Sequence, residues 1–271
     1  YQISQYELPL ATRGLFEAVR ITRAHLEEDA GKSLHEGFVD SSRKTYVDFN
    51  RTGVPLIEIV TEPDLRSAAA AASFFTRLRE VLVWLGVNDG NMEEGSLRCD
   101  ANVSVRRVGD DPLGTKAEVK NLNSFRFLQK ALEYEIERQV DLLSGSGRVV
   151  QETRLWDSAA GRTVSMRSKE EAHDYRYFPD PDLPAVIVDA ARIASIRAAM
   201  PELPDARRYR LVEQYAIPEY DATQLTQARA VADYFEASVA AGAQPKAASN
   251  WIMGELARKL KAQSADIGAA P

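Results

Sequence analysis

The sequence predicts an α+β fold, in which a mainly antiparallel sheet carries helices on one face and is followed by a small all-helical domain. Stretches with apolar residues at every second position, typical of half-buried strands, lie on either side of two long stretches with helical spacing. From about Ala190 the chain becomes alanine-rich and is broken by prolines, which indicates four or five short helices. We therefore place a sheet domain at residues 1–189 and a helical domain at residues 190–271.

Residues 1–60 are predicted to form short strands and loops. Residues 18–23 alternate weakly, and a loop that contains His25 and Gly31-Lys32-Ser33 follows them. This triplet resembles a phosphate-binding loop, but that motif needs a glycine five positions before Gly31, where Leu26 stands, and a strand that feeds a helix. We therefore reject the phosphate-loop interpretation.

A hairpin is predicted from residues 46–49 and 56–60, which flank a turn at residues 50–55. Asp48 and Glu58 interrupt its otherwise apolar strands. These charges either discourage the aggregation of an edge strand or belong with a loop in which Asn50 and Arg51 face a ligand. The residues alone leave both interpretations open.

The most informative stretch of the sequence runs from Met92 to Arg106. From Gly95 onward apolar and polar residues alternate strictly, which predicts a half-buried strand. Its polar face presents four side chains in a row, Glu94, Arg98, Asp100 and Asn102. Asp and Asn are poor strand formers, so we expect a requirement other than strand stability to have placed them there.

Residues 115–121 alternate again after a turn-rich segment, and we expect them to pair with this strand in an antiparallel hairpin. Glu118 and Lys120 would then share a face with Asp100 and Asn102, to within a register slip of two residues. Such a patch is able to hold Mg²⁺ through oxygen ligands and phosphates through its cations. A salt-bridged, solvated sheet face explains the same residues, and the hairpin alone does not decide between the two.

Two long helices are predicted to bracket this hairpin. The first begins at Glu62-Pro63-Asp64, because proline and acids suit a first helical turn, and continues to Gly86. The second is capped by Asn123-Ser124 and ended by Gly145. Each carries an apolar stripe that is expected to pack on a core.

Residues 148–156 and 163–166 return to a strand pattern around a turn at Gly161. Residues 167–184 follow, and their prolines exclude a helix after Phe178. An aromatic, charged loop of this kind is either functional or a lid on the core.

Composition limits the class of protein. The net charge of −6 argues against gripping nucleic acid by overall electrostatics, although a local basic surface remains open. The single cysteine, Cys99, excludes internal disulfides and lies on the core face of its strand, so we interpret it as a small buried apolar residue. The three histidines share no metal-ligand spacing. No apolar run is long enough to cross a bilayer, and these features together fit the cytoplasm.

Four segments, residues 46–60, 92–104, 120–124 and 166–183, closely resemble the B subunit of the bacterial aspartyl/glutamyl-tRNA amidotransferase. The resemblance follows the chain in order and covers nearly all of it. It implies a glutamine-synthetase-like antiparallel platform that uses ATP and Mg²⁺. It further implies that the side-chain carboxylate of Glu-tRNA(Gln) or Asp-tRNA(Asn) is phosphorylated and that ammonia then displaces the phosphate. The partners would be a glutaminase A subunit and a small C subunit in a heterotrimer, together with the mischarged tRNA.

The resemblance and the patch together assign the candidate site residues. Glu94 and Glu118 are expected metal ligands, with Glu93 and Asp100 as further candidates. Arg98 and Lys120 are expected to contact phosphates, and Asn102 to orient substrate or a metal-bound water. The residues expected to line the same cleft are Asn50, Arg51 and Arg176.

Two features of the family are not recognised in the 271 residues: an N-terminal segment with a metal-binding Glu-x-His motif and a C-terminal tail domain that grips tRNA. We therefore expect little or no amidotransferase activity from these residues alone. Two alternatives stay open, a non-catalytic tRNA-binding scaffold module and a stand-alone carboxylate-amine ligase for a small molecule. Dependence of ATP turnover on mischarged tRNA separates the small-molecule ligase from the amidotransferase. Glu94→Ala and Glu118→Ala test the scaffold, since they should abolish amidation in the full-length complex if the patch is catalytic and only alter stability if it is structural.

Overall fold

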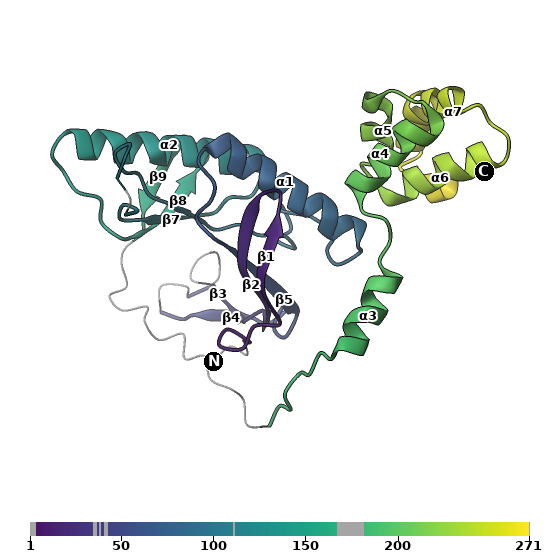
Figure 1. The fold of residues 1–271 in the computed structure, drawn as a ribbon. Helices are drawn as coiled ribbons and strands as arrows, with labels where there is room; N and C mark the ends of the chain where they lie inside the picture. Colours follow the sequence, from purple (N-terminus) through teal and green to yellow (C-terminus); the bar gives the residue numbers. More distant parts are fainter. Residues whose placement is uncertain are drawn as a thin grey trace.

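The computed structural model describes residues 4–34, 37, 39–40, 43–110, 112–166 and 182–270. In these residues, strands and two long helices make up the first part of the chain, and shorter helices make up the last part (Figure 1). The strands are β1 (Ala11–Phe16), β2 (Val19–Glu28), β3 (Lys32–Leu34), β4 (Tyr46–Asp48), β5 (Pro55–Thr61), β6 (Ala101–Val103), β7 (Ala117–Lys120), β8 (Thr153–Asp157) and β9 (Arg162–Ser165). The mixed α and β composition with antiparallel pairing confirms the predicted class.

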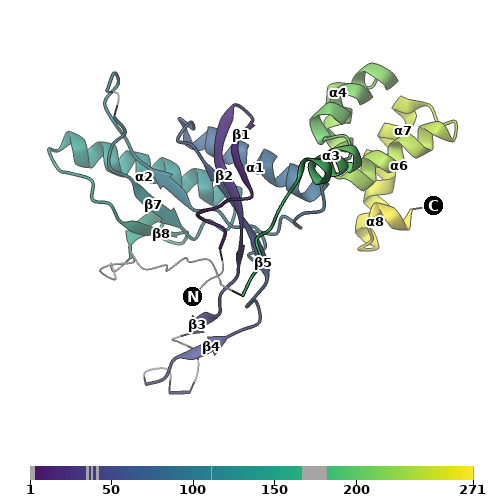
Figure 2. The same cartoon turned by 60° about the horizontal axis from the view of Figure 1, so that its bottom comes forward.

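The strands form sheets with the orders β1-β2-β5, β3-β4 and β6-β7-β8-β9. All neighbours pair antiparallel except β7 and β8, which run parallel. This exception has a simple cause, because α2 (Phe125–Ser144) connects β7 to β8 and returns the chain to the same end of the sheet. Figure 2 shows the β3–β4 pair projecting away from the sheet that α1 (Ala68–Trp84) and α2 cover.

The first hydrophobic core lies between the four-stranded sheet and the two long helices. Val119 and Trp156 contribute from the strands, and Leu128 and Ala131 contribute from α2. Phe75 of α1 packs against the same cluster. The prediction of helices on one face of the sheet therefore agrees with the position of this core.

The predicted hairpin of residues 46–60 is wrong. β4 pairs with β3, and β5 pairs with β2, so the two predicted strands belong to different sheets. The cause is the length of β2, which extends through the segment predicted as a loop around His25 and offers β5 seven paired positions from Ile21 to Glu28. The short segment Lys32-Ser33 lies in strand β3 and feeds no helix, which agrees with the rejection of a phosphate loop.

Both long helices are capped by serine, but the first begins later than predicted. Ser67 caps α1 and accepts a hydrogen bond from the Ala70 backbone N–H, so Pro63 and Asp64 lie before the helix. Asp64 instead accepts hydrogen bonds from the backbone and guanidinium of Arg20. Ser124 caps α2 and Gly145 ends it, as the sequence predicts.

The last part of the chain is helical. Its elements are α3 (Ala190–Ala199), α4 (Pro204–Tyr215), α5 (Glu219–Leu225), α6 (Arg229–Ala240), α7 (Pro245–Trp251), a short π-helix (Ile252–Leu256), α8 (Ala257–Ala262) and a 3₁₀ turn (Ile267–Ala269). A second core gathers residues of α4 to α7 and the π-helix, with Phe235, Leu211 and Leu225 fully buried. The helical character is as predicted, and the position of the domain boundary at residue 190 stays a prediction.

Polar contacts connect α1 with α4 and with the segment that precedes α4. The indole N–H of Trp84 donates to the backbone oxygen of Glu202 at 2.9 Å. The Arg207 guanidinium lies 5.7 Å from the centre of the Trp84 ring, and Arg77 pairs with Asp205. These contacts place the start of the helical part against the end of α1.

The ion-pair cluster on Glu236 predicts a pH dependence for the helical part. Hydrogen bonds from Arg210 lower the pKa of Glu236 from 4.5 to about 2, with Arg207 adding to the effect and burial opposing it. Because the folded-state pKa is depressed, the stabilisation is complete above pH 4.5 and is lost as the pH falls towards 2. Glu236→Gln should therefore lower the free energy of unfolding of the helical part by roughly 2 kcal/mol at pH 7 and by much less at pH 3. Hydrogen exchange of the amides in α4 and α6 measures this difference. An equal cost at both pH values would contradict this assignment.

Within the described residues, no helix is long and apolar enough to span a bilayer.

Candidate functional site

The polar face predicted from residues 95–106 is present, but the regular strand is shorter than predicted. Only Ala101–Val103 forms β6, whereas residues 96–97 lie in a bend and residues 98–100 have no regular pairing. Alternation nevertheless holds, since Leu97 and Cys99 pack against the first core while Arg98, Asp100 and Asn102 are exposed. Burial of one side of the segment, rather than strand pairing along its whole length, orients these side chains.

A turn at residues 92–95 presents the two glutamates. The Asn91 side-chain oxygen accepts hydrogen bonds from the backbone N–H groups of Glu93 and Glu94, at 3.0 and 3.1 Å. Gly95 closes the turn with a φ of 76°, a left-handed conformation that favours glycine. Both glutamate side chains are exposed to solvent.

The predicted hairpin of β6 and β7 is confirmed with its register. Asn102 lies opposite Glu118, which places Lys120 beside Asp100. The Lys120 ammonium lies 2.9 Å from an Asp100 carboxylate oxygen and 3.6 Å from a Glu118 carboxylate oxygen. Thr153 of β8 donates to the other oxygen of Glu118 at 3.0 Å. Two acids and a lysine therefore meet on one face of the hairpin.

Arg51 and Arg98 meet at Asp29, a residue that the sequence reasoning missed. Asp29 Oδ2 accepts from Arg51 Nε at 2.9 Å and from an Arg98 amino group at 3.1 Å. Arg51 also donates to the backbone oxygens of Glu94 and Gly95, both at 3.2 Å. Asp29 follows β2 in a segment without local pattern, so only long-range folding reveals its position between the two arginines.

The remaining predicted site residues are less closely tied to the hairpin. Asn50 lies in the turn after β4, and its backbone N–H donates to Asp48 at 2.9 Å, while its side chain is exposed. Arg176 lies outside the described residues. The structure thus places Arg51 in contact with the turn that holds Glu94. Asn50 is next to Arg51 in the sequence, but its side chain is exposed.

The acids on this face offer carboxylate oxygens, which are the ligands that Mg²⁺ prefers. In the described residues, however, Glu93, Glu94, Asp100 and Glu118 do not bring three ligand atoms together. Asp100 and Glu118 instead share Lys120. The assignment of these acids as metal ligands therefore stays a prediction.

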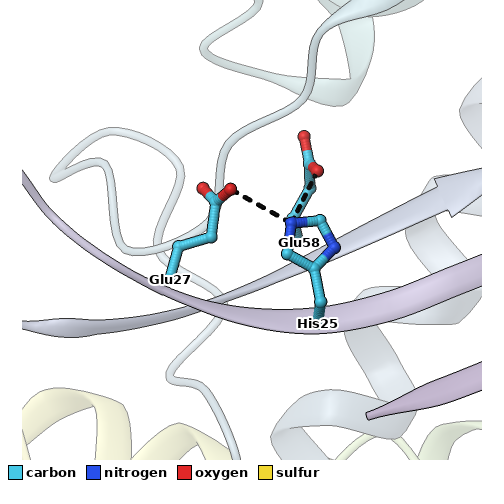
Figure 3. Close-up of side chains that lie close together, drawn as sticks. All are labelled: His25, Glu27 and Glu58. Carbon is cyan, nitrogen blue, oxygen red and sulfur yellow. Dashed lines mark hydrogen bonds and ion pairs between the residues drawn. The ribbon is translucent and has the colours of Figure 1, made fainter. Parts of the chain in front are cut away.

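A second cluster, on β2 and β5, does bring three ligand atoms together. His25 Nε2 lies 3.0 Å from a Glu27 oxygen and 3.2 Å from a Glu58 oxygen (Figure 3). His25 is fully buried, whereas Glu58 is half-exposed. The loop predicted around His25 is wrong, since β2 holds both His25 and Glu27, and the pairing with β5 adds Glu58 from across the sheet.

A buried ionic network connects α2 with the four-stranded sheet. Glu135 of α2 is fully buried and accepts hydrogen bonds from Arg138, Gln139 and Thr163. Arg154 Nε lies 3.3 Å from the same carboxylate. Burial alone would raise the pKa of Glu135, but these hydrogen bonds outweigh it and lower the pKa.

Cys99 has no role as a nucleophile in this arrangement. Burial raises the pKa of its thiol to about 12, and the Asp100 charge adds to the effect. The thiolate, which is the reactive form, is therefore scarce at neutral pH. The predicted role of Cys99 as a small core residue is confirmed by its packing against the first core.

Fold and site together define a class: an α+β domain with a charged sheet face, joined to a helical part. The family described as the GatB/GatE catalytic domain matches residues 1–194 of the sequence, and the chain belongs to this family.

Curated relatives extend this likeness over the whole chain. The chain is 55% identical over 275 residues to the B subunit of the aspartyl/glutamyl-tRNA(Asn/Gln) amidotransferase of Thermodesulfovibrio yellowstonii, with 98% of the chain and 57% of the relative aligned. It is also 55% identical to the proteins of that name from Janthinobacterium sp. and Bordetella pertussis, with all of the chain and 58% of each relative aligned. The chain thus spans a little over half the length of the relatives it matches.

Proposed function

We propose that the chain forms the phosphorylating part of a tRNA-dependent amidotransferase. In this reaction ATP phosphorylates the side-chain carboxylate of Glu-tRNA(Gln), Asp-tRNA(Asn) or both, and ammonia displaces the phosphate to give the amide. The observation that carries the proposal is the gathering of Lys120, Asp100 and Glu118 on one face of the β6–β7 hairpin in a member of the GatB/GatE family. The name of the relatives supports the same reaction.

The chemistry requires such a face. Transfer of a phosphoryl group between two anions is catalysed mainly by positioning and by positive charge that stabilises the developing negative charge. Lys120 and Arg98 supply cations on adjacent parts of this surface, and Arg51 lies beside Arg98 through Asp29. We propose that Arg98 and Lys120 contact phosphates and that Asn102, opposite Glu118, orients the substrate.

Mg²⁺ is proposed to bind through Glu94 and Glu118, with Glu93 and Asp100 as further candidates. Divalent metal would neutralise phosphate charge when bound. Since Lys120 contacts both Asp100 and Glu118, its ammonium occupies part of the space between these acids and holds their side chains in place. Asn50 and Arg176 are proposed to line the same cleft.

The sheet is proposed to act as a glutamine-synthetase-like platform within a larger assembly. Antiparallel strands with helices on one face support this view, because the polar face is left open to substrate. The proposed partners are a glutaminase A subunit that delivers ammonia, a small C subunit, and the mischarged tRNA. The word subunit in the name of the relatives supports an assembly of several chains.

The proposal is tested with the full-length protein assembled with its partner subunits. ATP turnover is measured with Glu-tRNA(Gln), with correctly charged Gln-tRNA(Gln) and without tRNA. We expect ADP release and amide formation only with the mischarged tRNA. Unchanged ATP turnover without tRNA would favour a small-molecule ligase, and tRNA binding without any ATP turnover would favour a non-catalytic scaffold; either result overturns the proposal.

A further inference from the structure

We propose that Asp29 is a positioning residue of the phosphate site. Its carboxylate holds the guanidinium groups of Arg51 and Arg98 side by side, so that both cations meet the phosphate chain of ATP as one preorganised unit. This role rests on the proposed function, which supplies the ligand. Asp29 acts through the two arginines and not on the nucleotide directly.

Backbone hydrogen bonds fix Asp29 beside the turn that carries Arg51. The Asp29 N–H donates to the Val54 carbonyl oxygen at 2.8 Å, and the Asp29 carbonyl oxygen accepts from the Gly53 N–H at 2.9 Å. The Val54 N–H in turn donates to the Arg51 carbonyl oxygen at 3.1 Å. The Asp29 side chain is 16% exposed, so the surrounding atoms leave its carboxylate little room to turn away.

A single oxygen of Asp29 joins the two arginines. Oδ2 accepts from Nε of Arg51 at 2.9 Å and from an amino group of Arg98 at 3.1 Å. In the described part of the chain, Asp29 is the acid that pairs with either arginine. Two guanidinium groups held this close repel one another unless an anion lies between them, so Asp29 keeps the pair together.

Both guanidinium groups remain accessible to a ligand. The Arg98 side chain is 57% exposed and the Arg51 side chain is 41% exposed, whereas the carboxylate between them is largely covered. A guanidinium carries several N–H donors in a planar fork, and Asp29 engages few of them. Two cations on one carboxylate leave a net positive charge, and phosphate oxygens are ligands that suit such forks.

The arginine pair lies beside the patch around Lys120. Arg98 and Asp100 are two positions apart on the exposed side of their segment, and the Lys120 ammonium lies 2.9 Å from Asp100. Arg51 is held in addition by the backbone oxygens of Glu94 and Gly95, both at 3.2 Å. Cations that are positioned before the substrate arrives need no reorganisation when negative charge develops, so a group that positions them contributes to the reaction.

A solvated ion-pair cluster that binds nothing would show the same contacts, and the sign of one substitution separates the two cases. Asp29→Asn removes a negative charge and nearly keeps the shape of the side chain. Loss of charge alone would make a phosphate bind equally or more tightly, because a carboxylate repels it. If Asp29 positions the arginines, the same change should weaken binding about tenfold, which is the equivalent of one charge-assisted hydrogen bond.

The test uses the full-length protein assembled with its partner subunits and titrated, in MgCl₂, with adenylyl imidodiphosphate, a non-hydrolysable ATP analogue. We expect Asp29→Asn to weaken binding about tenfold in isothermal titration calorimetry. In an Arg98→Met background the same change should have less than about a threefold effect, because it acts through Arg98 and because Arg51 keeps its backbone acceptors.

Asp205→Asn is the matched control. One oxygen of Asp205 also accepts from two arginines, Arg77 and Arg208, but at the contact of α1 with α4. This substitution removes the same charge and separates a similar pair outside the patch, so the affinity for the analogue should not change. Hydrogen exchange of the amides in β2 and β5 shows that each Asp29 variant is folded.

Asp29→Glu is a second variant, which keeps the charge between the arginines and should recover most of the affinity. Equal or tighter binding by folded Asp29→Asn would overturn the inference. So would an equal loss with and without Arg98, no recovery in folded Asp29→Glu, or no binding of the analogue by the unsubstituted protein. Binding with the expected coupling but without tRNA-dependent ATP turnover would support the role of Asp29 and contradict only the proposed amidotransferase function.

Discussion

Replacing Lys120 by methionine is expected to slow ATP-dependent amidation by about 10²–10³-fold in the full-length protein assembled with its partners. The methionine keeps the unbranched stem and removes the ammonium that lies between Asp100 and Glu118. A cation aimed at developing phosphate charge acts mainly in the transition state, so the loss should fall on kcat more than on KM. Single-turnover formation of Gln-tRNA with saturating ATP measures the effect.

The control for Lys120→Met is Lys116→Met. Lys116 is exposed and precedes β7 by one position, so the same change alters the net charge equally but lies outside the patch. Exposed ion pairs contribute little to stability, about 1 kcal/mol or less, so both variants should stay folded. Equal activity of the two variants would show that the patch is a solvated, salt-bridged surface and not a phosphate site.

Glu135→Ala is expected to destabilise the sheet domain by about 3–5 kcal/mol, because it leaves the charges of Arg138 and Arg154 without their buried partner. The carboxylate also accepts from Thr163 of β9 and Gln139 of α2, and Gln139 donates in turn to the Val103 backbone oxygen of β6. Hydrogen exchange at the amides of β8 and β9 measures the free energy of local unfolding. Glu137→Ala, two positions along on the exposed side of α2, should change it by about 0.5 kcal/mol or less.

The pKa of Glu135 gives this prediction a pH dependence. Hydrogen bonds hold the pKa below its ordinary value of 4.5 in the folded state. The ionised carboxylate therefore stabilises the fold fully above pH 4.5, and this contribution disappears as the pH falls through the lowered pKa. The difference in the free energy of local unfolding between the protein and its Glu135→Gln variant should accordingly become smaller below pH 4.5. A constant difference down to pH 3 would mean that shape, and not charge, is responsible.

Elements with local signals were predictable from the sequence. The Ser124 cap and the Gly145 end of α2 depend on groups within one helical turn, so the sequence pattern contains them. The alternation of Leu97, Cys99 and Ala101 similarly reports a buried face, which the structure confirms. The hairpin of β6 and β7 followed from two such runs joined by a turn.

Errors arose where pairing partners are distant in sequence. β5 resembles the second strand of a hairpin with β4, yet it pairs with β2, because strand pairing depends on which surfaces meet in three dimensions. The prediction placed a weakly alternating stretch at residues 18–23 and a loop around His25, whereas β2 continues to Glu28. The pairing with β5 and the burial of His25 explain why these residues are nevertheless in a strand.

The sequence by itself determined the α+β class, the presence of two long helices, the cap and end of the second of them, the charged face around Lys120 and the family to which the chain belongs. Only the tertiary structure decided that Asp29 joins Arg51 to Arg98 and that Glu58 meets His25 and Glu27. The physical reason is that periodicity and capping act over a few neighbouring residues, whereas these contacts join positions 22 to 69 residues apart or pair separate strands. Such contacts form only when hydrophobic burial has brought the elements together.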